Sequence, residues 1–402
     1  MWDKFLPGEM QRRWDLARDL MKRNNLIGLL VFGNSGVNRH NEANVFWLSN
    51  HLDLHHNYLI APLDTNIKPA LYTGLTNHVP NARQVSDIPV IEWGGYDPPE
   101  KIIAYLSRVG MTRGRLGLVG VNDKFGMGMP YQHYRTLQHG LPGIELVDIT
   151  LEYTRMRTIK SAEEIEWLRK AAAFTDNTVK ALQIEIKPGM TDYNLLGIIE
   201  GAYRYDGGIP HIAFLRSMAM DAPNGCLPAQ NPSRRVIEKG DVIITEISAS
   251  YWGYSGQIHR PIFVGADPNP EWQKMFDTAL AAYENISNVI KPNATERDVI
   301  QAASVIGENG YSIYDDLIHG YGVDIHPPLI DRSCVDYWPW DGANNPAPLG
   351  RAFAKDMAIV IQPNPVTLDE TMGLQLGALT VVTEHGVECL HNIPFEPIVV
   401  EI

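Results

Sequence analysis

Two histidines in the second half of the chain have the residue type and spacing of an acid–base pair. His319 and His326 lie seven positions apart and bracket a Gly-Tyr-Gly segment. Imidazole is the side chain whose ordinary pKa lies nearest neutral pH, so two of them on facing segments could give and take protons in one reaction. Asp324 could orient the second ring or could lie at the surface. A structural role for one of the two histidines is the alternative.

A carboxylate and two polar neighbours lie in a second segment, residues 242–264, which has strand composition on both sides of a Gly-Tyr-Ser-Gly turn. Glu246 is therefore expected on a buried strand, where acids are rarely unpaired. It is either a catalytic or substrate-binding group or the ion-pair partner of Arg260. Gln257 and His259 are two residues apart, so they share one strand face and are expected in the pocket, whereas Arg260 faces away.

Two loops supply further candidates for substrate contact. His55 and His56 lie in a loop between two expected strands and could line a pocket, although a solvated loop is the alternative. Trp338 and Trp340 lie in a loop rich in turn-forming residues, and they could cover a pocket or pin the loop. All four are candidate substrate-binding residues.

Strands alternate with helical stretches up to residue 147, which indicates an α/β domain. Apolar residues at helical spacing predict a helix over 9–24, and an apolar run predicts a buried strand over 26–32. Further short strands are predicted at 45–48, 58–61, 70–72 and 115–121.

A domain boundary is expected near residue 155, where the chain turns from basic to acidic. Ser161 and Glu164 then form the sequence pattern of a capping box that begins a helix. Two domains, 1–155 and 156–402, follow. Within the second, the motifs at 186–194 and 290–298 repeat a Lys-Pro turn followed by a threonine that can cap a helix, which indicates two similar halves or two copies of a common turn.

Composition narrows the choice of partners. The 402 residues carry a formal net charge of -13, which disfavours nucleic acid and anionic membranes because both bind basic surfaces. The three cysteines have no metal-binding or disulfide spacing, and no apolar run is long enough to cross a bilayer. We expect a cytoplasmic protein with a small-molecule substrate.

Several of these segments together resemble the creatinase/aminopeptidase P/prolidase family. The similarity lies in the 155–165 motif, the 242–264 hairpin, the His319 and His326 pair and the 381–386 segment, and it extends over nearly the whole chain. It implies an N-terminal creatinase-type α/β domain followed by a C-terminal catalytic domain of the "pita-bread" fold, with pseudo-twofold symmetry and overall α/β (α+β) class.

The resemblance also implies five metal ligands, most of which are missing in this chain. Metal-dependent members use two Asp, one His and two Glu, and the matching positions are Glu246, Gln257, His319, Gln362 and Gly377. Divalent cations held close together need anionic ligands, for which neutral carboxamides are poor substitutes. We therefore expect a metal-free branch of the family that uses no cofactor.

Metal-free members suggest a function. Creatinase and the ectoine hydrolases have this layout, but the positions of creatinase's two substrate carboxylates are His259 and Gln362, which cannot pair with a guanidinium. We expect a metal-independent hydrolase that cleaves a C–N bond, in an amidine, amide or related group, of a small nitrogenous compound. Glu246 would be base or nucleophile, and His319 and His326 would move protons. Gln257 and Gln362 would form hydrogen bonds to polar groups of the substrate.

Three alternatives remain open: a metal-dependent Xaa-Pro peptidase of the prolidase type, a lyase of a small osmolyte, and a non-catalytic binding protein. The family resemblance also implies a homodimer in which a first-domain loop reaches the partner's active site. In this chain that loop would carry His55 and His56.

Overall fold

The protein is described by a computed structural model that covers residues 3–34, 42–121, 128–335, 337 and 351–401. The chain divides into two compact units, Met1–Arg157 and Thr158–Ile402, which are considered separately. The division lies two residues beyond the boundary expected from the sequence.

The N-terminal unit is a six-stranded mixed sheet with helices on both faces, in the strand order β4-β3-β2-β1-β5-β6. Strand β1 pairs antiparallel with β2 and parallel with β5. The elements are α1 Pro7–Arg23, β1 Gly28–Gly33, α2 Glu42–Ser49, β2 Asn57–Pro62, β3 Ala70–Thr73, η1 Thr76–His78, α3 Val79–Val85, β4 Val90–Trp93, α4 Pro98–Arg108, β5 Gly114–Val119, α5 Tyr131–Gly140, β6 Ile144–Asp148 and α6 Thr150–Met156.

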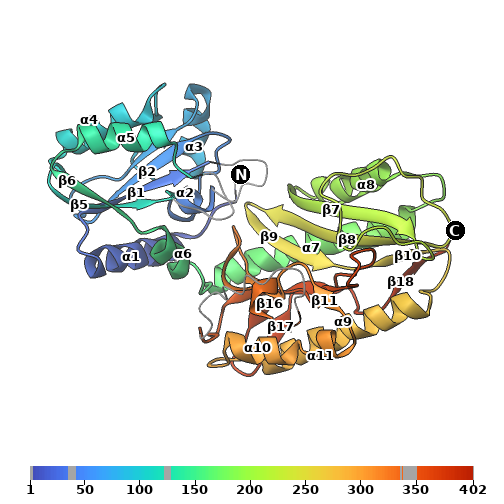
Figure 1. Ribbon diagram of the computed structural model, residues 1–402. Helices are drawn as coiled ribbons and strands as arrows, with labels where there is room; N and C mark the ends of the chain where they lie inside the picture. The colour runs from blue at the N-terminus through green and yellow to red at the C-terminus, as the bar shows by residue number, and fades with distance from the viewer. Residues whose placement is uncertain (1–2, 35–41, 122–127, 336, 338–350, 402) are drawn as a thin grey trace. The chain divides into compact units, whose positions relative to one another are not determined.

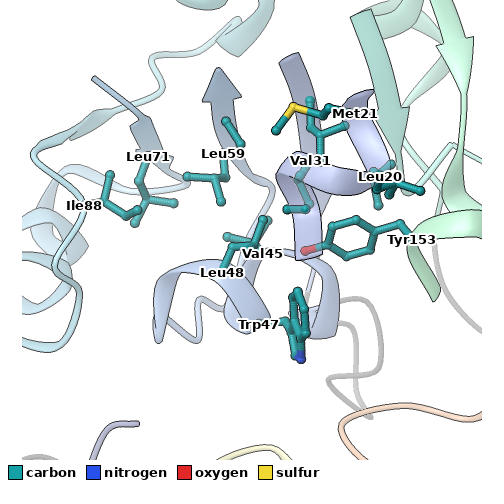
Figure 2. Close-up of a cluster of buried hydrophobic side chains, with 14 of the residues drawn as sticks. Leu20, Met21, Val31, Val45, Trp47, Leu48, Leu59, Leu71, Ile88 and Tyr153 are labelled. Atoms are coloured by element: carbon teal, nitrogen blue, oxygen red, sulfur yellow. The ribbon is translucent and has the colours of Figure 1, made fainter. Parts of the chain in front are cut away.

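One predicted element of this unit is wrong: residues 45–48 form part of helix α2, not a strand. Val45, Trp47 and Leu48 all join the buried cluster drawn in Figure 2, together with Tyr153 of α6. A short run that is buried on every side has no periodicity to distinguish helix from strand. Asn50 ends the helix in the left-handed conformation, with φ of 59°.

The C-terminal unit is built on a ten-stranded sheet in the order β13-β12-β14-β16-β9-β8-β10-β18, with β7 beside β8 and β17 beside β16. Its elements are α7 Ala162–Glu185, α8 Asp192–Arg204, β7 Ile209–Ala219, β8 Asp241–Tyr251, β9 Tyr254–His259, β10 Ile262–Val264, α9 Pro270–Val289, α10 Glu296–Ala302, α11 Val305–Glu308, β11 Ser312–Ile313, β12 Ile318–Gly320, β13 His326–Ile330, η2 Arg332–Cys334, β14 Ala358–Ile361, β15 Pro365–Val366, β16 Gly377–Val382, β17 Val387–Cys389 and β18 Ile398–Val400.

Two helical layers cover this sheet, one over each half (Figure 1). Helices α7 and α8 pack on β7, β8 and β9, whereas α9 packs on β14. Each half has its own apolar cluster. The second helix of each layer begins at a threonine capping box, at Thr191 and Thr295, as the repeated motif predicts. Ser161 likewise caps α7 with Glu164.

The expected fold class is confirmed: an α/β domain precedes a larger domain in which two helical layers cover one sheet. Among the described residues, no helix is long and apolar enough to cross a membrane.

Candidate functional site

Sheet register places the candidate residues of β8 and β9 on one face. Gln257 pairs with Ser248, which lies two residues from Glu246 on the same strand. His259 pairs with Gly377 of β16. Residues paired across antiparallel strands point to the same side, as do residues two apart on one strand. Glu246, Gln257 and His259 therefore face the same side of the sheet.

The neighbouring strands extend this face. His319 on β12 pairs with Val360 on β14, and Gln362 follows Val360 by two residues. Strands β12, β14, β16, β9 and β8 are consecutive neighbours in the sheet. The β8–β9 hairpin, β12 and the end of β14 thus bring polar side chains to one surface, as the resemblance implies.

The side-chain nitrogen of Gln257 is the centre of the site. It donates to Glu246 Oε1 at 3.0 Å and to Gln362 Oε1 at 3.4 Å, and it lies 3.3 Å from His259 Nε2. Three acceptors around one NH₂ group fix the orientation of the amide, because the reversed amide would press its oxygen against all three. His259 Nε2 is then an acceptor, and its ring proton lies on Nδ1.

Two further acids hold the outer carboxamides. Gln362 Nε2 donates to Asp316 Oδ1 at 3.1 Å, and Gln375 Nε2 donates to Asp315 Oδ2 at 3.1 Å. Hydrogen bonds therefore run without a break from Glu246 through Gln257 and Gln362 to Asp316. Such a network fixes side-chain positions more strongly than isolated pairs do.

Glu246 is an unusually basic carboxylate. Burial of the carboxyl group, and secondly the charge of Asp315, raise the pKa of Glu246 to about 8. Burial also raises the pKa of Asp315. Since burial disfavours the charged form of an acid, Glu246 retains its proton near neutral pH and can donate it.

His259 is held neutral and has an unused donor. Burial, and secondly the neighbouring His319, lower the pKa of His259 well below its ordinary value. Its Nδ1 is buried without a hydrogen-bonding partner in the described chain, and so is the side-chain oxygen of Gln257. A buried polar atom left unpaired costs about 1–3 kcal/mol. A bound ligand could therefore form a hydrogen bond with the His259 donor and another with the Gln257 acceptor.

The two histidines of the predicted acid–base pair have different surroundings. His319 Nδ1 lies 3.3 Å from the Gly320 carbonyl oxygen, and its ring packs edge-on against Tyr321. His326 lies against the backbone of Gly320, where an added Cβ would come 2.2 Å from His326 Nδ1. The buried Lys160 places its Nζ 2.7 Å from His326 Nε2. Because an ammonium only donates, Nε2 is the acceptor and the ring proton lies on Nδ1.

Arg260 has a structural role. Its guanidinium donates to four backbone carbonyl oxygens, those of His259, Gly377, Ile393 and Pro394, at 2.8–3.0 Å. It also lies 3.9 Å from the centre of the Phe395 ring. The carboxyl of Glu246 instead accepts from Gln257, so the Glu246–Arg260 ion pair considered from the sequence does not form in the described chain.

The remaining candidates lie elsewhere. His55 and His56 line a pocket of about 410 Å³ in the N-terminal unit, beside Trp93, Tyr96 and His133. Trp338 and Trp340 lie outside the described residues.

Sequence reasoning missed several side chains at the site. Lys160 is part of the motif that marked the domain boundary, and the acidic pair Asp315-Asp316 directly precedes β12. The position of the two aspartates, three and four residues before His319, was a signal for them. Ser248 and Tyr321 adjoin predicted residues by one or two positions, and His211 gave no signal at all.

Comparison with known proteins shows the family to which the chain belongs. A model of metallopeptidase family M24 matches residues 166–384, and a model of the creatinase/prolidase N-terminal domain matches residues 13–159. The chain belongs to this family. The residues of the hydrogen-bonded network, from Glu246 to Gln375, all lie within the first match.

Its relatives span most of its length. It is 27% identical over 297 residues to a probable dipeptidase PepE of Mycobacterium tuberculosis, which covers 73% of this chain and 74% of the relative. It is 24% identical over 371 residues to an Xaa-Pro dipeptidase of Pyrococcus horikoshii, with coverage of 92% and 93%. The structure of an X-Pro aminopeptidase from Thermotoga maritima matches with a TM-score of 0.80 at 19% identity, covering 96% of this chain and 99% of the other, and shows the same fold.

These comparisons correct the expected function. The family is one of metallopeptidases, and the relatives are dipeptidases. Both findings contradict a metal-independent hydrolase of an amidine or similar small nitrogenous compound, and they contradict the description of the chain as metal-free. They favour the alternative of a prolidase-like peptidase, and they show the coarser class: a family of hydrolases acting on C–N bonds.

The side chains at the family's metal-ligand positions differ in this chain from the ligands that divalent cations need. The Gln257 nitrogen presents N–H donors to the point where the three acceptors converge, and a cation would need a lone pair there. A side chain at Gly377 would meet the Ile361 carbonyl oxygen at 2.4 Å, so no fifth ligand fits that position without backbone movement. The described residues contain no group of three His, Cys, Asp or Glu able to hold a metal. This donor set does not fit a pair of divalent cations.

Proposed function

We propose that the chain hydrolyses the C–N bond of a short peptide, with Xaa-Pro dipeptides as the substrate class. The observation that carries the proposal is that Glu246, Gln257 and Gln362 are joined by hydrogen bonds on one sheet face, inside the region matched by the peptidase family. Two relatives that align over most of the chain, an Xaa-Pro dipeptidase and a probable dipeptidase, support the substrate class.

The unpaired polar atoms of the site complement a peptide group. His259 Nδ1–H can donate to a carbonyl oxygen, and the Gln257 side-chain oxygen can accept from an N–H, such as the free amine of a dipeptide. Both atoms come from β9, two residues apart. A ligand that has an acceptor and a donor close together removes both desolvation penalties at once.

Glu246 supplies the proton that peptide hydrolysis requires. When the C–N bond breaks, the leaving nitrogen must gain a proton, and a carboxyl group with a pKa of about 8 still holds one at neutral pH. His319, which lies near His259, and His326, fixed by Lys160, would position the carbonyl and the attacking water.

The test is a panel of dipeptides incubated with the purified full chain, with and without added Mn²⁺, and analysed by mass spectrometry. The panel pairs Xaa-Pro peptides with the same residues in reversed order. Release of both amino acids from Xaa-Pro and not from Pro-Xaa supports the proposal. Equal cleavage of all dipeptides would reject the Xaa-Pro class, and cleavage of none under either condition would reject peptide hydrolysis.

We also propose that the chain forms a homodimer in which the pocket containing His55 and His56 contributes to the partner's substrate site. The dimer rests on the family resemblance, and the pocket, of about 410 Å³ with a lining of histidine and aromatic side chains, is the part of the unit that could bind a substrate group. Sedimentation velocity should give a dimer, and His56→Ala should raise KM without changing kcat. A monomer that hydrolyses its substrate at full rate would contradict the shared site.

A further inference from the structure

Three side chains beside the network form a triangle of close polar contacts. Tyr321 Oη lies 2.8 Å from His211 Nδ1 and 3.0 Å from Ser248 Oγ, and Ser248 Oγ lies 3.1 Å from the same His211 nitrogen. They come from β7, β8 and the residue directly after β12. Ser248 and Tyr321 are fully buried, whereas His211 is half-buried, so only His211 reaches solvent.

A β-bulge places His211 in this triangle. The register of β7 on β8 shifts between Pro210, which pairs with Ala249, and Ile212, which pairs with Ser248, so His211 is an extra residue with no partner of its own in the ladder. In a regular strand its side chain would point away from the Ser248 face. Bulges re-aim side chains in this way and are common next to active sites.

The triangle adjoins the proton donor of the site. Ser248 lies two residues from Glu246 on the same face of β8. The Tyr321 ring packs edge-on against His319 at a centroid distance of 5.1 Å.

We propose that Ser248, Tyr321 and His211 form a proton relay that deprotonates the attacking water, an inference that rests on the proposed peptide hydrolysis. The water gives a proton to Ser248 Oγ as the serine proton passes to Tyr321 Oη and the tyrosine proton passes to His211 Nδ1. The water oxygen bonds to the carbonyl carbon, the C–N bond breaks, and the nitrogen leaves with the proton of Glu246. His211 then releases its proton to solvent, and Glu246 regains one.

The directions of the hydrogen bonds agree with this route. In the resting state Tyr321 donates to the lone pair of His211 Nδ1, and Ser248 donates to the tyrosine oxygen. Each hydroxyl is thus both donor and acceptor, which is the requirement for passing a proton along a chain. After transfer the Ser248–Tyr321 and Tyr321–His211 hydrogen bonds persist with donor and acceptor exchanged, so no side chain needs to move.

The test compares kcat for Xaa-Pro hydrolysis in His211→Ala, Tyr321→Phe and Ser248→Ala with the wild type. General base catalysis contributes about 100-fold or more, so each variant should lose about that factor in kcat with little change in KM. Added imidazole should restore at least about tenfold to His211→Ala, because the site of the lost ring is open to solvent. Imidazole should not restore kcat in Tyr321→Phe, because in that variant the proton cannot pass from Ser248 to His211.

Two variants are matched controls. Ser250→Ala removes a second buried hydroxyl from β8, one without a hydrogen-bonding partner in the described chain, and His385→Ala removes an exposed imidazole. Both should keep the wild-type kcat. Melting curves identify any variant that fails to fold. If His211→Ala fails to fold, it is replaced by His211→Gln, which retains an acceptor but cannot take up the proton.

The outcomes separate the two proposals. A wild type that cleaves no dipeptide rejects peptide hydrolysis and the relay with it. An active wild type whose folded His211 variants keep full kcat rejects the relay alone. So does a loss in Ser248→Ala no larger than that in Ser250→Ala, or a loss in His211→Ala that imidazole leaves unchanged.

Discussion

At the Gln257 amide, a single nitrogen lies among a carboxyl group, an imidazole and a second amide. An N–H group carries only a partial positive charge, and His259 is neutral, so no full positive charge stabilises the Glu246 carboxylate. Burial then dominates, which explains why the pKa of Glu246 rises to about 8. A proton donor at neutral pH is the chemical result of replacing acids by carboxamides.

The pH dependence of hydrolysis should follow Glu246. Its proton is bound below a pKa of about 8 and lost above it, so kcat should fall as the pH rises through that value. The measurement is kcat for an Xaa-Pro dipeptide between pH 6 and 10 (roughly the range over which the group titrates). A kcat that rises through pH 8 would show that Glu246 acts as a base.

Restoring acids should strengthen cation binding. The double variant Gln257→Asp and Gln362→Glu adds two anionic donors to Glu246 and His319, so we expect its affinity for Mn²⁺ to exceed the wild type's by at least about tenfold in calorimetry. Gln301→Glu, on the exposed face of α10, adds a charge away from the site and should change nothing. Wild-type binding as tight as the double variant's would contradict our description of the donor set.

Individual positions at the site were predictable, but their contacts were not. Motif matching located Glu246, Gln257 and Gln362, because ligand positions are fixed by the strands that carry them. The direction of the Gln257 amide and the pairing of Gln362 with Asp316 depend on neighbours from distant segments. No local pattern in the sequence records such contacts.

At the scale of elements, local signals predicted the helices that have distinct ends. Capping patterns at Ser161, Thr191 and Thr295 gave the starts of α7, α8 and α10. Helix α2 was not predicted because its apolar run is buried on all sides and has no polar face. Such a run shows no helical periodicity in its hydrophobic residues. The β7 bulge at His211 also could not be predicted from the sequence, because a bulge depends on how β7 pairs with β8.

Arg260 should be essential to the local arrangement of β9, β16 and the C-terminal segment. Arg260→Met would leave four buried carbonyl oxygens without their donor, and we expect a loss of about 3–5 kcal/mol in the free energy of unfolding. Arg169→Met, which breaks an exposed ion pair with Glu388, should cost less than about 1 kcal/mol. Urea denaturation of both variants makes the comparison, and equal losses would contradict the assigned role.

For the whole molecule, the family resemblance predicted the fold and misled about the function. The two-unit architecture and the related halves of the second unit follow from motifs spread along the chain. The missing acids led to the interpretation of a metal-free enzyme, which the comparisons contradict, and they say nothing about which C–N bond is cut. Substrate class depends on the whole pocket and not on five positions, and the dipeptidase relatives motivate the class that we propose.

The most direct test of peptide hydrolysis at this site is the turnover and melting temperature of Glu246→Gln. The variant keeps the shape and the acceptor for Gln257 but removes the proton, so Xaa-Pro hydrolysis should fall by about 100-fold or more. The raised pKa stabilises the fold while Glu246 is protonated, and that contribution disappears as the pH rises from 4.5 towards about 8. The variant should therefore melt no lower than the wild type at pH 7 and higher at pH 9 (about one unit above that pKa). A stable Glu246→Gln protein that hydrolyses its substrate at the wild-type rate would contradict the assignment.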